Sequence, residues 1–267
     1  MKTIEELTTS NDGFSIGQAI SDGWNIIAKH LGYYILAGIL ATLITMAAGM
    51  IPFIGSLAGN LIISPCLMAG AIYITWQVSK GNAWTDFGDM FKGFSYLTPI
   101  MVSSLIQAAV YAVLILLLFF NFLPDIIELV KLTQGSGAYS NQAEIEQLAR
   151  QLFLGSKMIL LILVFVLISL VISAIWAFRL HFIVIYKMEG WPAMEMSRKV
   201  CTKNMFPLIG LFILLGIIII ISAIPCGIGL LFSLPLSIGA LYSAFAQITK
   251  CDHEEEVQLD FTGNSNV

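Results

Sequence analysis

Long apolar stretches follow one another along this chain, and their apolar residues run continuously instead of alternating with polar ones. Because the hydrocarbon core of a bilayer is about 30 Å thick, a helix needs roughly 20 apolar residues to cross it. Six stretches are long enough: 31–50, 57–78, 97–122, 156–178, 206–224 and 228–248. Continuous runs of this length predict membrane-spanning helices and not the shorter, alternating strands of a barrel.

Two joints between these stretches are very short. Ile51–Gly55 connects the first stretch to the second, and Ile224–Gly227 connects the fifth to the sixth. Both contain proline and glycine, which are typical where a helix ends and the chain reverses. With the third and fourth stretches also paired, the sequence predicts an all-α, polytopic membrane helix bundle of six transmembrane helices arranged as three hairpins.

The joint between the third and fourth stretches is longer and polar. Within 123–155, Asp125–Thr133 continues the third helix, Gly135-Ser136-Gly137 forms a tip, and a second helix returns from Tyr139. An apolar stripe on the returning helix can pack on the first. We therefore expect an outer helical hairpin at 123–155. A self-packed stalk is the favoured interpretation, and a docking surface for a protein partner is the alternative.

Each pair of stretches follows a shorter amphipathic segment. Short helices with an aromatic apolar face and mixed charges normally lie at the membrane interface. Each hairpin is therefore expected to follow a cytoplasmic-side amphipathic helix. The apolar positions are Ile16, Ile20, Trp24, Ile27 and Leu31; then Trp84, Phe87, Phe91 and Phe94; then Trp191, Met194, Cys201 and Met205.

This order of one short and two long helices predicts a single membrane domain with three repeat-like units. Ser64-Pro65 and Ser233-Leu234-Pro235 interrupt the returning helix of the first and third units in the same way. We expect a polar N-terminal segment at 1–13, a membrane domain at 14–250 and an acidic, disordered tail at 251–267. The units are 14–80, 81–188 and 189–250.

Composition agrees with the membrane prediction. Hydrophobic residues make up 58% of the 267 residues and charged residues 11%, against roughly 45–50% and about 25% in soluble domains. A net charge of −4 provides no basic face for a nucleic acid. Nine basic residues fall in the predicted inner segments and three in the outer ones, so both termini are expected to be cytoplasmic.

Known catalytic patterns are missing from the sequence. The three histidines have no metal-ligand spacing, and there is no GxSxG motif or P-loop. No Asp or Glu lies within any of the six stretches, so the usual proton relay of a pump is also missing. Asn60 and Gln107 are single neutral polar residues, for which hydrogen bonding between helices is the favoured role. We therefore predict no catalytic residues, no metal and no cofactor.

One group of basic residues suggests a lipid site. Lys157 and Arg179 are 22 residues apart, which is about 33 Å of helix. The favoured interpretation is that both side chains extend to the two membrane surfaces. The alternative is a basic pocket for an anionic lipid headgroup. Its candidate residues are Arg179, His181, Arg198, Lys199 and Lys203.

The same region carries a resemblance to a known group of proteins. Its residues are Arg179-Leu180-His181-Phe182, Glu189-Gly190-Trp191, Met194, Ser197-Arg198-Lys199 and Lys203-Asn204. This passage resembles bacterial six-helix membrane proteins of unknown function, which are similar to the membrane domain attached to some glycerophosphodiester phosphodiesterases. The resemblance implies a bacterial inner-membrane location and a helical membrane domain. It implies no phosphodiesterase activity, because the catalytic barrel and its acid/base residues are missing from this sequence.

These observations favour a non-enzymatic integral membrane protein that binds membrane lipids or a partner protein. The alternative is a transporter or channel for an uncharged or amphiphilic solute. The oligomeric state stays open at this point.

Overall fold

All elements of the computed structural model are helices within the residues it describes, which are 2–9, 12–52, 54–82, 84, 86–134, 150, 155–225 and 227–252. The first half contains α1 (Ile4–Thr9), α2 (Ile16–Ala28), α3 (Leu31–Gly49), α4 (Ile54–Ala58), the π-helix η1 (Gly59–Ile63), α5 (Ser64–Ser79) and the 3-10 helix η2 (Phe87–Tyr96). The second half contains α6 (Leu97–Gln134), α8 (Ser156–Ile175), α9 (Arg179–Ile185), α10 (Gly190–Lys203), α11 (Met205–Ala223) and α12 (Leu230–Thr249).

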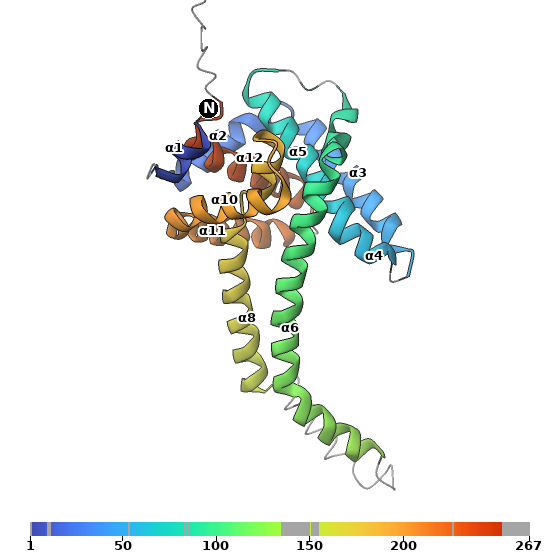
Figure 1. The fold of residues 1–267 in the computed structure, drawn as a ribbon. Helices are drawn as coiled ribbons and strands as arrows, with labels where there is room; N and C mark the ends of the chain where they lie inside the picture. Colours follow the sequence, from blue (N-terminus) through green and yellow to red (C-terminus); the bar gives the residue numbers. More distant parts are fainter. Residues whose placement is uncertain are drawn as a thin grey trace, which may run out of the picture.

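Six helical segments are long and apolar enough to cross a membrane. They coincide with the six stretches expected from the sequence, so the all-α, six-helix membrane bundle is confirmed. The pairs are α3 with α4–α5, α6 with α8, and α11 with α12 (Figure 1). One short helix precedes each pair, namely α2, η2 and α10, in the order that the sequence predicts.

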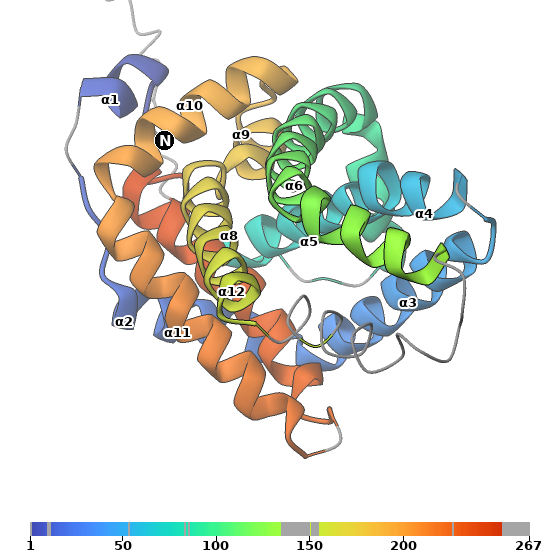
Figure 2. The ribbon, with the colours of Figure 1, turned by 90° about the horizontal axis from the view of Figure 1, so that it is seen from below.

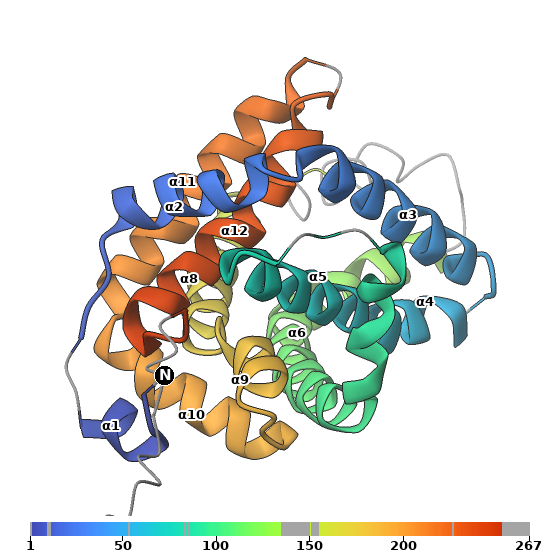
Figure 3. The same cartoon turned by 90° about the horizontal axis from the view of Figure 1, so that it is seen from above.

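The three hairpins diverge from one packed region. Figure 2 looks along α6 and α8, whereas α3, α4, α11 and α12 are seen lengthwise, so the α6–α8 pair runs across the other two. The packed region, here called the junction, is formed by α2, α5, α9, α10 and α12 (Figure 3). The six spans differ in how far their most apolar part is buried within the protein. In α12 56% of the residues of that part are buried, whereas in Lys157–Ile185 only 6% are buried. Most of the hairpin surface therefore remains for lipid.

Helix α9 lies in the middle of the junction. All of its residues from Leu180 to Ile185 are buried, because the sequence Leu-His-Phe-Ile-Val-Ile offers no charged face to water. The sequence predicts that the fourth span ends at Phe178. In the structure α8 ends at Ile175, and a short turn separates it from α9, which continues inside the protein.

Helices α2 and α12 cross at very short range because glycine faces glycine. A Cβ atom added to Gly23 would lie 2.5 Å from the Ala240 nitrogen, and one added to Gly239 would lie 2.6 Å from the Gly23 oxygen. Small residues allow helix backbones to approach in this way. Helix α2 is thus joined to the last span, with Ala19, Gly23 and Ile27 buried.

The apolar residues predicted for the segments before the second and third hairpins are partly buried against protein and partly exposed, with Trp84 only 3% exposed. In η2 the buried residues are Met90 and Gly93, whereas Phe91 is 43% exposed. In α10 Met194 is buried but Trp191 is 63% exposed. Both helices pack against the rest of the protein through small or flexible residues and leave aromatic residues exposed. Periodicity in the sequence does not show which apolar residues contact protein and which are exposed.

Both described ends of the chain are attached to the junction. The Lys2 N–H donates to the Thr249 oxygen at 3.1 Å, and Leu7 of α1 is buried in the core. At the other end, the Ser79 hydroxyl donates to Asp252 Oδ1 at 2.8 Å, and Tyr242 donates to the same oxygen. Cys251, the first residue of the predicted tail, is also buried; the remainder of that tail, residues 253–267, lies outside the described residues.

The predicted outer hairpin at 123–155 is described only in part. Helix α6 continues to Gln134, as expected, with Pro124 inside it. Figure 1 shows the far end of α6 changing direction, which is typical of a helix that contains proline. The expected tip and most of the returning helix lie outside the described residues.

The glycine contact between α2 and α12 predicts opposite effects for two alanine substitutions in α2. Gly23→Ala should lower the melting temperature of the detergent-solubilised protein by several degrees, because overpacking costs about 1–3 kcal/mol. Gly17→Ala is the matched control, since no atom lies within 4 Å of its added Cβ. It should leave stability equal or raised by up to about 1 kcal/mol. Tryptophan fluorescence on heating measures both, and equal melting temperatures for the two variants would contradict the contact.

Candidate functional site

The break between α8 and α9 positions Arg179 at the start of α9. Ser197 of α10 stabilises this break: its hydroxyl accepts the Phe178 N–H at 3.2 Å and donates to the Ile175 oxygen at 3.0 Å. Buried backbone groups at a helix end need such partners. One serine thus replaces the helical hydrogen bonds lost at the turn and fixes where α9 begins.

The Arg179 side chain lines a cavity of about 350 Å³ between three parts of the chain. We call this space the Arg179 cavity. Its polar lining residues are Asn60 and Ser64, then Ser104, Gln107 and Tyr111 from α6, and Arg179. The Arg179 guanidinium donates from Nη1 to the Ser103 hydroxyl at 3.3 Å. This position differs from the favoured expectation that the side chain extends to the membrane surface.

The charge of Arg179 is not balanced within this cavity. None of the residues that line it is acidic, and no Asp or Glu occurs in any of the six predicted stretches. The Ser104 hydroxyl is buried and makes no hydrogen bond within the described part of the chain. An arginine inside a membrane protein is costly unless it is paired. Its planar donors suit a carboxylate or phosphate, so the cavity favours an anion.

A π-helix forms one wall of the Arg179 cavity. Ser64 donates its N–H to the Gly59 oxygen, five residues earlier, and Pro65 has no N–H with which to continue the helical ladder. Single π-helical turns often occur at functional sites. Here the wide turn carries Asn60, which lines the cavity and donates to the Ser56 oxygen at 2.8 Å.

His181 lies outside the Arg179 cavity. Two residues along a helix correspond to about 200° of rotation, so the two side chains point to different sides of α9. The His181 ring is 2% exposed and stacks on Phe245 at 5.0 Å, with Phe178 at 5.7 Å. Neither ring nitrogen has a hydrogen-bond partner among the described residues. The His181 ring is therefore part of the aromatic core of the junction.

The three basic residues of α10 also lie elsewhere. Arg198 is exposed and donates to both oxygens of Glu195, at 2.8 and 2.6 Å, which holds the pKa of that carboxyl below its usual value. Lys199 is 3.9 Å from the same carboxylate, and Lys203 donates to the Thr8 oxygen at 2.6 Å. Exposed pairs of this kind contribute little stability. The structure does not gather the five basic residues into one pocket.

Sequence reasoning found part of this site. Arg179, Asn60 and Gln107 were singled out, but without a reason to place them together. Ser104 and Tyr111 were missed, because a serine or tyrosine in a long apolar stretch gives no separate signal. The pair Ser64-Pro65 was the available sign of an irregular helix beside the cavity.

No protein-family model matches this chain, and no curated protein or solved structure matches it either. The resemblance of residues 179–204 to bacterial six-helix membrane proteins therefore stays a prediction. No cluster of three His, Cys, Asp or Glu side chains with the arrangement of a metal site occurs within the described residues. We take the Arg179 cavity as the candidate site because it combines a guanidinium with several neutral polar residues.

The aromatic surroundings of His181 predict that its imidazole nitrogens are dispensable. His181→Phe should leave the melting temperature unchanged or higher, because replacing an unpaired buried polar group by an apolar one of similar shape is neutral or stabilising. Phe245→Ala, in the same cluster, should cost about 3–5 kcal/mol. Thermal unfolding in detergent measures both. Strong destabilisation by His181→Phe would show that the ring nitrogens hold a partner.

Proposed function

We propose that this chain is a non-enzymatic membrane protein that binds the anionic headgroup of a membrane lipid in the Arg179 cavity. One observation carries this proposal: a guanidinium lies between helices of the bundle, and no acidic residue is among the described residues that line its cavity. A bound phosphate would supply the missing negative charge and accept hydrogen bonds from Arg179 and Ser104.

The depth of Arg179 supports a lipid as the source of that phosphate. Ile175, where α8 ends, lies 18 residues after Lys157, and this corresponds to about 27 Å of helix, close to the thickness of one hydrocarbon core. Arg179 follows this end after one short turn. Arg179 therefore lies near the level of the headgroups on one side. Basic pockets between helices at this level bind anionic lipid headgroups.

We further propose that the protein lies in a bacterial inner membrane with both termini in the cytoplasm. The excess of basic residues in the predicted inner segments supports this orientation. The hydrogen bond from Lys2 to Thr249 supports a common side for the chain start and the end of the last span. A protein partner at the outer hairpin, 123–155, stays a prediction.

Transport of an amphiphile is the second candidate function. Its support is a second cavity, of about 260 Å³, that shares Ser64 and Met68 with the Arg179 cavity, beside an irregular helix. Proteoliposomes with labelled phosphatidylglycerol in one leaflet separate the two functions. Protein-dependent loss of the asymmetry favours transport, and a stable asymmetry together with lipid binding favours a binding protein.

Replacing the buried guanidinium should remove the lipid preference. Arg179→Gln should weaken phosphatidylglycerol binding about tenfold or more, because charge-assisted hydrogen bonds contribute about 1.5–3 kcal/mol. Arg198→Gln is the matched control: it removes the same charge from an exposed pair with Glu195 and should bind as the parent protein does. Native mass spectrometry with phosphatidylglycerol and phosphatidylcholine measures the preference.

Two results of this experiment would count against the proposal. Equal phosphatidylglycerol binding by Arg179→Gln and the parent protein would show that the Arg179 cavity is not the headgroup site. Displacement of the lipid by inorganic phosphate would identify a soluble anion as the natural ligand, since a chain-bearing lipid gains additional contacts with the bundle.

Cysteine labelling tests the proposed orientation. Burial raises the pKa of the Cys201 thiol to about 12 and that of Cys251 to about 11, so both are poor nucleophiles at neutral pH. In a Cys226→Ser background, we introduce Met50→Cys at an 85% exposed hairpin end, or Lys199→Cys on α10. A membrane-impermeant maleimide should label Met50→Cys in intact cells, and Lys199→Cys only after permeabilisation. The reverse pattern would contradict the orientation.

A further inference from the structure

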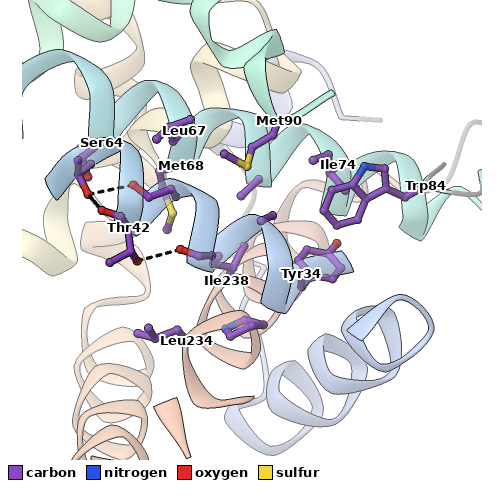
Figure 4. Close-up of a pocket in the computed structure, with 16 residues that line it drawn as sticks. Tyr34, Thr42, Ser64, Leu67, Met68, Ile74, Trp84, Met90, Leu234 and Ile238 are labelled. Atoms are coloured by element: carbon purple, nitrogen blue, oxygen red, sulfur yellow. Dashed lines mark hydrogen bonds between the residues drawn. The ribbon is translucent and has the colours of Figure 1, made fainter. Parts of the chain in front are cut away.

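A second cavity lies next to the Arg179 cavity, between α3, α5 and α12. We call it the α3–α5 cavity; its volume is about 260 Å³. Figure 4 shows Ser64 at one end and Tyr34 and Trp84 at the other. The lining is mostly small or apolar: Ala37, Gly38, Ala41, Leu67, Met68, Ala71, Ile74, Met90, Leu234, Pro235 and Ile238, with Tyr34, Thr42, Thr45, Ser64 and Trp84.

The polar groups that line this cavity are mostly occupied elsewhere. Tyr34 shares a hydrogen bond of 3.1 Å with Thr75, and Trp84 Nε1 donates to the Asp86 oxygen at 2.8 Å. Thr42 and Thr45 donate to backbone oxygens of their own helix. Water needs two to four polar partners to occupy a cavity. The α3–α5 cavity therefore suits a chain of methylene groups.

Its length corresponds to one lipid chain. The lining residues of α5 run from Ser64 to Ile74, and these two positions, 10 residues apart, are separated by about 15 Å along the helix. Half of a hydrocarbon core of about 30 Å is the depth of one leaflet. A chain could thus lie along α5 for about one leaflet's depth without leaving the cavity.

The two cavities meet at one edge. Ser64 and Met68, one helical turn apart on α5, line both of them. Methionine is unbranched and flexible, so Met68 can move aside without a change in the backbone. A lipid whose phosphate lies at Arg179 can therefore pass a chain across this edge.

We infer that the α3–α5 cavity holds one acyl chain of the anionic lipid whose headgroup binds Arg179. This inference rests on the proposed function. Transfer of a chain from the bilayer into an apolar cavity brings no hydrophobic gain, because lipid tails are equally apolar. The headgroup therefore provides the affinity, and the α3–α5 cavity fixes the position of the chain through dispersion contacts.

Photo-cross-linking tests this placement. The purified protein in nanodiscs receives phosphatidylglycerol with a diazirine at the end of one acyl chain, or phosphatidylcholine with the same chain. Gly38→Leu adds a side chain at the cavity wall, at a position where no atom lies within 4 Å of the added Cβ. Gly32→Leu, on the same helix, also has free space but does not line the cavity. Cross-linked peptides are identified by mass spectrometry, and headgroup preference is measured in parallel.

The inference predicts cross-links to cavity residues of α3, α5 or η2 in the parent protein and in Gly32→Leu. In Gly38→Leu these cross-links should fall to background while the preference for phosphatidylglycerol is retained. Cross-links spread over the exposed hairpin surfaces, or equal cavity labelling by phosphatidylcholine, would overturn the inference. If the proposed headgroup site is wrong, a different result is expected: Arg179→Gln would keep the full preference for phosphatidylglycerol.

Discussion

The positive charge of Arg179 is the constraint on which the candidate site depends, because none of the described residues around its cavity is acidic. Water compensates such a charge at a protein surface, but inside a membrane bundle the compensation must come from fixed dipoles or an anion. The described structure supplies the Ser103 hydroxyl, which is a weak partner for a full charge. A negatively charged ligand is the physical complement of this arrangement.

Two local irregularities build the space around that charge. Ser197 stabilises the break after Ile175, and this break turns Arg179 toward the cavity while His181 enters the aromatic core. On the facing wall, Pro65 ends the regular hydrogen-bond ladder and η1 widens the helix. Both irregularities depend on single residues within otherwise regular apolar helices. The site is therefore determined by where helices are interrupted.

The sequence predicted much of the fold, because the physics of a bilayer leaves few choices. Stretches without charge must become helices, and a Pro-Gly joint must reverse the chain. The divergence of the hairpins could not be predicted from the sequence. The contact of Gly23 with Gly239 could not be predicted either, since the spacing of glycines in one helix does not identify the helix that it contacts. The sequence indicates Arg179 as a candidate, whereas in the structure Arg198 and Lys199 lie beside Glu195 and do not line the Arg179 cavity. Adjacency in sequence does not show which side of a helix a residue occupies.

The most direct measurement is an electron cryomicroscopy structure of the protein in nanodiscs that contain phosphatidylglycerol. We expect density for a phosphate within about 3 Å of the Arg179 guanidinium, in the cavity that Asn60, Ser104 and Gln107 also line. A well-resolved cavity without lipid density, or an Arg179 side chain extended to the bilayer surface, would contradict this expectation.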